Sequence, residues 1–101
     1  MSAETEAEIL NALGDDIREV RIKFLLAPPG SDLRQSLQRK HASMSNDYNQ
    51  LLKNGISPLV TVTQEDLLEV REIGEEIAAA IEQAQLFAAI AKLVGFIARL
   101  L

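Results

Sequence analysis

Cysteine and tryptophan are both missing from this sequence of 101 residues, and histidine occurs only once, at position 41. Without cysteine the chain forms neither disulfides nor thiolate metal sites, which suits a reducing compartment. The acidic N-terminal residues 1–8 also lack the basic region and the apolar run of a signal peptide. We therefore expect a cytoplasmic protein.

The residue types that catalytic and metal sites commonly use are scarce in this sequence. One histidine and no cysteine leave no Cys–His pair and no multi-histidine metal site. The turn at 27–31 contains two prolines and a glycine but lacks the spaced glycines and the lysine of a phosphate-binding loop. We expect no enzyme, no cofactor and no bound metal.

Aromatic residues make up only 4% of the chain, and its formal net charge is −5. Nucleic-acid binding depends on neutralising phosphates and on stacking bases, so we expect no nucleic-acid partner. The apolar fraction of 48% and the charged fraction of 25% are typical of one globular domain, here residues 1–101. A chain this short builds a modest core, which makes oligomerisation plausible.

Two stop signals divide the chain into helices. Pro28, Pro29 and Gly30 form the first, and the pair Asn54–Gly55 forms the second. We predict helices at about 3–27, 32–54 and 64–101, with an extended connector at 55–62 lying on the core. A hairpin about Asn54–Gly55 is a weaker alternative, because the residues before it do not alternate as a strand would.

The third helix has the clearest start. Thr63 is placed to cap it, and Val62 and Leu67 are spaced to form a hydrophobic staple across the cap. Apolar and small residues then recur at steps of three or four, as in a helix packed on near-parallel neighbours. They are Val70, Ile73, Ile77, Ala80, Ala84, Phe87, Ala91, Val94, Ala98 and Leu101.

These patterns predict an all-α fold, a three-helix bundle (up-down-up) with a long C-terminal helix. Gly74 is the position where that helix would kink, because glycine is a poor helix former and its neighbours are charged. A full break at Gly74 is an alternative that would make a four-helix domain.

An unbroken third helix would be about 57 Å long, against roughly 33 to 38 Å for the first two. Its last part, 86–101, is apolar on nearly every side, and such a helix must be buried from several directions. We expect another chain to complete the bundle there, and coverage within the monomer is the alternative. The predicted interaction surface combines a ridge of small residues with leucine and isoleucine lines: Ala84, Ala88, Ala91, Gly95, Ala98, Leu86, Leu93, Leu100, Ile90 and Ile97.

Two polar features have a simple and a functional interpretation. His41 lies on the apolar line of the second helix. It is either a side chain at the boundary of the core or a pH-sensitive contact in a helical interface. Four acids share one face of the third helix, where they form a solvated surface or dock the basic side chains of the second helix; a divalent cation is the less expected ligand. They are Glu65, Glu69, Glu72 and Glu76.

The sequence therefore predicts a non-catalytic helical module for protein–protein interaction or oligomerisation. Its partner would be a second copy or another helical protein, which associates through the apolar C-terminal helix. One alternative is a protein that attaches to a membrane surface through residues 86–101, where Lys92 and Arg99 form a narrow cationic edge. A second alternative is a small regulatory bundle that binds a ligand in its apolar interior.

Overall fold

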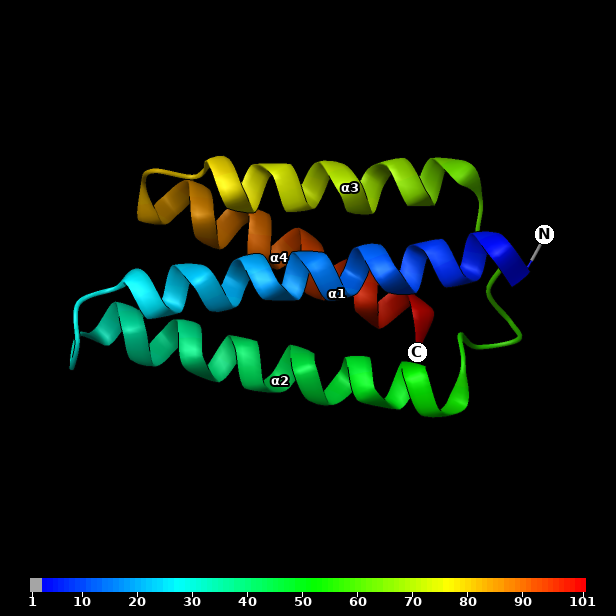
Figure 1. The fold of residues 1–101 in the computed structure, drawn as a ribbon, viewed down its shortest axis with the longest axis horizontal. Helices are drawn as coiled ribbons and strands as arrows, with labels where there is room; N and C mark the ends of the chain where they lie inside the picture. The colour runs from blue at the N-terminus through cyan, green and yellow to red at the C-terminus, as the bar shows by residue number, and fades with distance from the viewer. Residues whose placement is uncertain (1–2) are drawn as a thin grey trace.

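The computed structural model describes residues 3–101. Four α-helices make up most of this range, and no strand occurs within it, so the all-α fold is confirmed (Figure 1). In chain order they are α1 (Ala3–Leu26), α2 (Asp32–Asn54), α3 (Gln64–Ala79) and α4 (Gln83–Leu100).

The long C-terminal helix of the prediction does not exist as one element. Helix α3 ends at Ala79, and Ala80 takes an extended conformation, with φ −63° and ψ 127°. Glu82 is also extended, and α4 begins at Gln83. The predicted three-helix bundle with helix 64–101 is thus wrong, and four helices are present, as in the alternative.

The predicted position of the break was also wrong. Gly74 lies inside α3 and Gly95 lies inside α4, and the chain turns at residues 80–82 instead. One contact across the fold and two local hydrogen bonds stabilise that turn: the Lys23 ammonium of α1 donates to the Ala80 carbonyl oxygen at 2.9 Å. The side-chain oxygen of Gln85 accepts from the backbone amides of Ile81 and Glu82, both at 3.3 Å.

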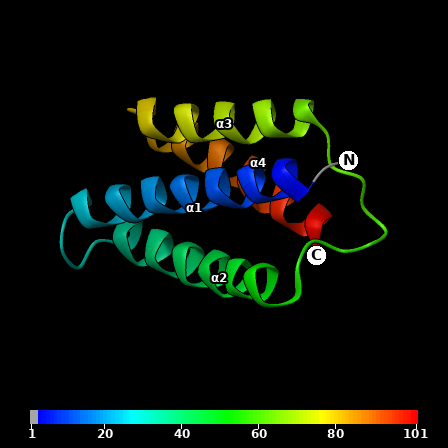
Figure 2. The ribbon, with the colours of Figure 1, turned by 45° about the vertical axis from the view of Figure 1, so that its right-hand side comes forward.

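The helices alternate in direction along the chain, so α1 runs parallel to α3 and α2 runs parallel to α4 (Figure 1). Helix α1 packs against α2 and α3, and α4 closes the bundle from behind by contacting α3 and α2. The connector crosses one end of the bundle between α2 and α3 (Figure 2). Val62 of the connector is buried, and the Ser57 amide donates to the Leu100 carbonyl oxygen at 2.9 Å, so these two points attach the segment to the core. Between them the chain turns, because the Val60 amide donates to the Ser57 carbonyl oxygen at 3.0 Å.

The stop signals at Pro28–Gly30 and Asn54–Gly55 and the start signal at Thr63 act as expected. Ser31 caps α2 by accepting a hydrogen bond from the Arg34 amide, and Gly55 ends that helix with φ 80°. Thr63 and Asp66 form a reciprocal capping box at the start of α3. Backbone groups at helix ends need such partners because the helix itself supplies none.

Each helix buries one apolar face in a shared core. The large buried apolar residues of α1 and α2 recur at steps of three, four or seven, as one face of a helix requires: Ile9, Leu13, Ile17, Val20, Leu37, Met44 and Leu51. Those of α3 recur at steps of three and four, but most of the buried set from α4 lies one position earlier than the line predicted through Phe87, Ala91 and Val94. The buried set consists of Leu86, Ala89, Ile90, Leu93, Phe96, Ile97 and Leu100.

That shift has a geometric cause. One residue corresponds to about 100° around a helix, since a turn contains 3.6 residues. When the chain reverses at 80–82, α4 presents a new face to the core, and the line extrapolated from α3 turns outward. Phe87 of that line is half-buried and Val94 is exposed.

Candidate functional site

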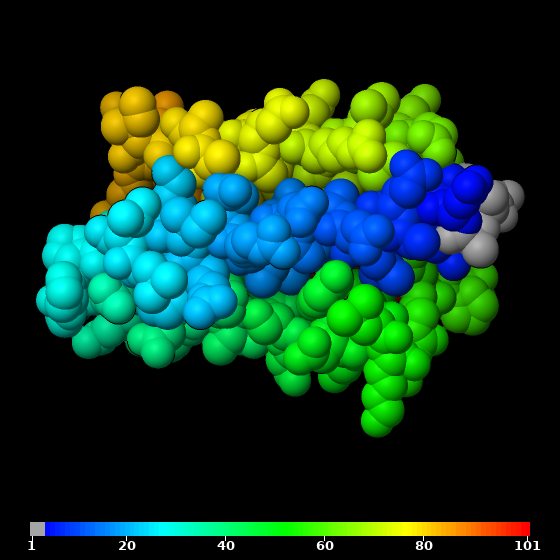
Figure 3. Space-filling model, in the orientation of Figure 1, coloured from blue at the N-terminus to red at the C-terminus, as the bar shows by residue number. Residues whose placement is uncertain are grey.

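Two surfaces stand out on the described chain: the outer face of α4, and a groove between α1 and α3. The space-filling view in Figure 3 shows α1 and α3 side by side on one side of the molecule. Helix α4 lies behind α1 in Figure 1, so the two surfaces face different directions.

The leucine and isoleucine half of the predicted interaction surface belongs to the monomer core. These side chains are at most 7% exposed, so they cannot contact a partner in this fold. The prediction that they form an intermolecular surface is therefore wrong, because α4 folds back on its own bundle. The residues are Leu86, Ile90, Leu93, Ile97 and Leu100.

The small-residue half remains on the surface. With Val94, which is 47% exposed, these residues form what we call the α4 outer face. A Cβ built on Gly95 would meet nothing within 4 Å, so the middle of this face is open. The α4 outer face consists of Ala84, Ala88, Ala91, Val94, Gly95 and Ala98, all exposed and none charged.

Charged side chains line one edge of that face and are already paired. Lys92 contacts Glu76, and Arg99 contacts Glu69, both at 2.8 Å. A groove of about 480 Å³ runs between α3 and α4 beside these pairs, with Gly95 and Phe96 in its wall. The α4 outer face is thus bordered by an acid–base edge and a groove.

The acidic face of α3 has different partners from those suggested by the sequence. Glu69 and Glu76 bind α4 instead of docking the basic residues of α2. Arg34 of α2 donates to the Ala27 carbonyl oxygen at 3.2 Å. Within residues 3–101, no group of three or more acids, histidines or cysteines has the geometry of a metal site.

His41 lies at the contact between α2 and α1, half-buried, with its ring 5.8 Å from that of Phe24 between centroids. Burial and, to a smaller extent, the Arg21 charge lower the pKa of His41 below its usual value. The imidazole is therefore neutral at pH 7, because both effects disfavour the cation.

Helix α4 has a further property that bears on membranes. Gln83–Leu100 is the one described helix whose length and composition would allow it to cross a membrane, with a mean hydropathy of 1.3. However, 39% of that segment is buried inside the bundle, and core helices of soluble proteins share the same composition.

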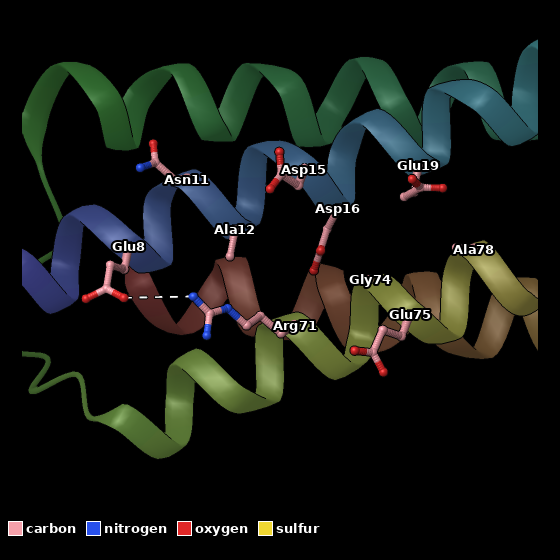
Figure 4. Close-up of a pocket in the computed structure, with 10 residues that line it drawn as sticks. All are labelled: Glu8, Asn11, Ala12, Asp15, Asp16, Glu19, Arg71, Gly74, Glu75 and Ala78. Atoms are coloured by element: carbon pink, nitrogen blue, oxygen red, sulfur yellow. Dashed lines mark ion pairs between the residues drawn. The ribbon is translucent and has the colours of Figure 1, made fainter.

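The α1·α3 groove was not anticipated from the sequence. It has a volume of about 440 Å³, and small side chains and acids from both helices line it (Figure 4). Arg71 crosses it toward Glu8, with 3.8 Å between the charged atoms. The lining residues are Glu8, Asn11, Ala12, Asp15, Asp16, Glu19, Arg71, Gly74, Glu75 and Ala78.

Asp16 is the unusual group in this groove. It is only 3% exposed, and its Oδ2 atom has no hydrogen-bond partner. Burial, followed by the charges of Asp15 and Glu19, raises the pKa of Asp16 from 3.8 to about 7. A carboxyl with this pKa exchanges its proton near neutrality, but its covered Oδ2 cannot touch a bound molecule in this conformation.

A sequence signal for Asp16 exists in retrospect. Asp16 follows Leu13 by three residues and precedes Val20 by four, so the helical period places it beside the buried face of α1. Gly74 follows Val70 by four residues and precedes Ile77 by three, so it lies beside the buried face of α3 in the same way. Only the packing of α1 on α3 brings the two positions together.

Comparisons with known proteins identify no relative: no family model, no curated protein and no solved structure matches this chain.

Proposed function

We propose that this chain is a non-catalytic helical module that associates with a second copy of itself through the α4 outer face. One observation carries the proposal: an uncharged face extends along α4, and no part of the described chain covers it. The reducing compartment suggested by the lack of cysteine belongs to the same proposal.

The side chains of this face favour helix-on-helix contact. Alanine and glycine allow two helix axes to approach at the close end of the usual range of about 8 to 10 Å. Val94 projects from the face and supplies apolar area, while the groove beside Gly95 offers room for an incoming side chain. Such a pattern matches a narrow helical interface better than a broad apolar patch.

The charges near the face support association of identical copies. Lys92 and Arg99 are neutralised by α3, so bringing two faces together does not bury an unpaired cation from α4. A two-fold dimer uses the same patch on both subunits, and a uniform row of small residues is compatible with itself. A second copy is therefore the simplest partner for this face.

The experiment is sedimentation equilibrium at several protein concentrations. We expect the wild type to dimerise and Ala91→Glu to weaken the dimer at least about tenfold, which corresponds to 1.4 kcal/mol. Ala42→Glu, on the exposed side of α2, is the matched control and should leave the dissociation constant unchanged. A wild type that stays monomeric at every concentration contradicts the proposal.

A second pair of variants tests the close approach of the helices. Replacing Ala88 and Gly95 together with leucine keeps the face apolar but thickens it, so we expect weaker self-association. Both positions point away from the core, so circular dichroism should show an unchanged helix content. An unchanged sedimentation profile would mean that the small residues do not set the contact distance.

Membrane-surface attachment is a second candidate, because α4 is the one described helix with the length and composition of a membrane segment. Flotation with neutral and anionic liposomes separates the two functions. Under the self-association proposal the protein stays in the dense fraction, whereas co-flotation abolished by Val94→Glu would support attachment to lipid.

A further inference from the structure

The contact between Asp16 and Gly74 lies where α1 and α3 approach each other closely. A Cβ atom at position 74 would collide with the Asp16 carboxyl group, so glycine is what allows the carboxyl to fit. The Asp16 side chain extends from α1 toward α3, beneath the rim of the groove (Figure 4). It is buried there without a hydrogen-bond partner for Oδ2.

The surrounding charges oppose ionisation of this group. Asp15 and Glu19 lie on the same helix, and Glu75 lines the groove from α3. Arg71 is the cation of the groove, and it pairs with Glu8. Among the described residues, the groove has no titratable lining group from α2 or α4.

A buried charge without a counter-ion is costly, because the protein interior solvates it poorly. The same burial and acidic neighbours move the pKa of Asp16 to about 7. Separation of α1 from α3 along the groove, which already admits solvent on its outer side, would hydrate an ionised Asp16.

We propose that the Asp16–Gly74 contact is a proton-controlled latch. The neutral carboxyl allows α1 to pack on α3, and loss of its proton favours an opened groove in which water reaches the carboxylate. This latch goes beyond the proposed self-association and does not depend on it, because it lies on α1 and α3 and leaves the α4 outer face untouched.

The direction of the pH effect follows from the pKa of Asp16 in the opened form and in the closed form. In the opened or unfolded chain Asp16 titrates near its ordinary value of 3.8, and in the closed form it titrates near 7. Between these values the closed form binds more protons, so raising the pH favours opening. Above about pH 7 both forms are ionised, and the effect reaches a plateau.

Hydrogen exchange measured by mass spectrometry tests the latch from pH 5 to pH 9, after correction for the intrinsic pH dependence of exchange. We expect the opening equilibrium for peptides of α1 and α3 around Asp16 and Gly74 to rise at least about tenfold between pH 5 and pH 7, then level off. Asp16→Asn should remove this rise. Asp15→Asn, an exposed neighbour, should keep it.

Asp16→Ala provides a second test in case the asparagine variant does not fold, since it removes the carboxyl and leaves no buried polar group. It should exchange at a rate independent of pH after the same correction. The latch is refuted if the wild-type equilibrium is flat from pH 5 to pH 7, or if both Asp16 variants retain the wild-type rise.

Discussion

Gly74 has a different role from the one that its sequence context predicted. A glycine between charged residues predicted a kink, yet α3 continues through it, and the missing side chain accommodates the Asp16 carboxyl. At the scale of the residue, glycine lowers helix propensity and at the same time permits a close contact between helices. The close contact is the property that the fold uses.

Gly74→Ala separates these two effects. In the wild-type background we expect a loss of about 1 to 3 kcal/mol in the free energy of unfolding, because the new methyl group displaces a buried carboxyl. In an Asp16→Ala background the same change should stabilise α3 by as much as about 1 kcal/mol, the propensity difference between glycine and alanine. Urea denaturation at pH 6 measures both. Destabilisation of equal size in the two backgrounds would show that Asp16 is not the group displaced.

At the scale of the element, helix ends fall into two classes. The start of α3 depends on Thr63 and Asp66, three residues apart, and the end of α1 depends on a proline pair and Gly30. These signals are local, so they were readable in the sequence. The boundary between α3 and α4 is different, because Ala78, Ala79 and Ala80 are strong helix formers and contain no stop signal.

Thr63→Ala tests the local class of signal. The change removes the side-chain oxygen that accepts from the Asp66 amide at 3.2 Å, and we expect a loss of about 1 kcal/mol in unfolding free energy. Thr61→Ala is a matched control in the connector, where the side chain is exposed, and should change stability by less than about 0.5 kcal/mol. Equal effects of the two substitutions would show that the cap contributes little.

At the scale of the whole molecule, the turn at 80–82 decides what the surface offers. A straight helix from 64 to 101 would have left its last part without cover, and the turn instead buries the leucine and isoleucine lines in a body 43 Å long. The need for a partner is therefore smaller than the sequence suggested. What remains is the narrower α4 outer face.

Because α4 folds back on α3, a spin label on each of these helices should lie close to the other. Because the chain has no cysteine, Leu68→Cys and Ala98→Cys, both at exposed positions, provide the only two thiols. In a continuous helix these residues would be about 45 Å apart, at 1.5 Å per residue. In the folded-back pair Arg99 contacts Glu69, so we expect label separations below about 20 Å for helix axes 8 to 10 Å apart. Double electron–electron resonance, with unlabelled protein in excess, distinguishes the two arrangements.

Like the helix ends, the candidate surfaces include one that the sequence could predict and one that only helix packing creates. The ridge of small residues on α4 could be predicted, because Ala84, Ala88 and Gly95 share one side of any helix that contains them. Whether that side faces the core or solvent could not be predicted, because it depends on how α4 is rotated about its own axis relative to the bundle. The α1·α3 groove was missed because Asp16 and Gly74 are far apart in sequence and meet only after packing.

The sequence by itself determined the all-α class, the positions of the caps and most of the buried lines, because these follow from helical periodicity and from hydrogen bonds between near neighbours. Only the tertiary structure decided that the chain reverses after Ala79, that Leu93 lies inside while Val94 lies outside, and that Asp16 is buried against Gly74. The physical reason is that burial of one apolar face of α4 outweighs the local preference of residues 78–82 to stay helical.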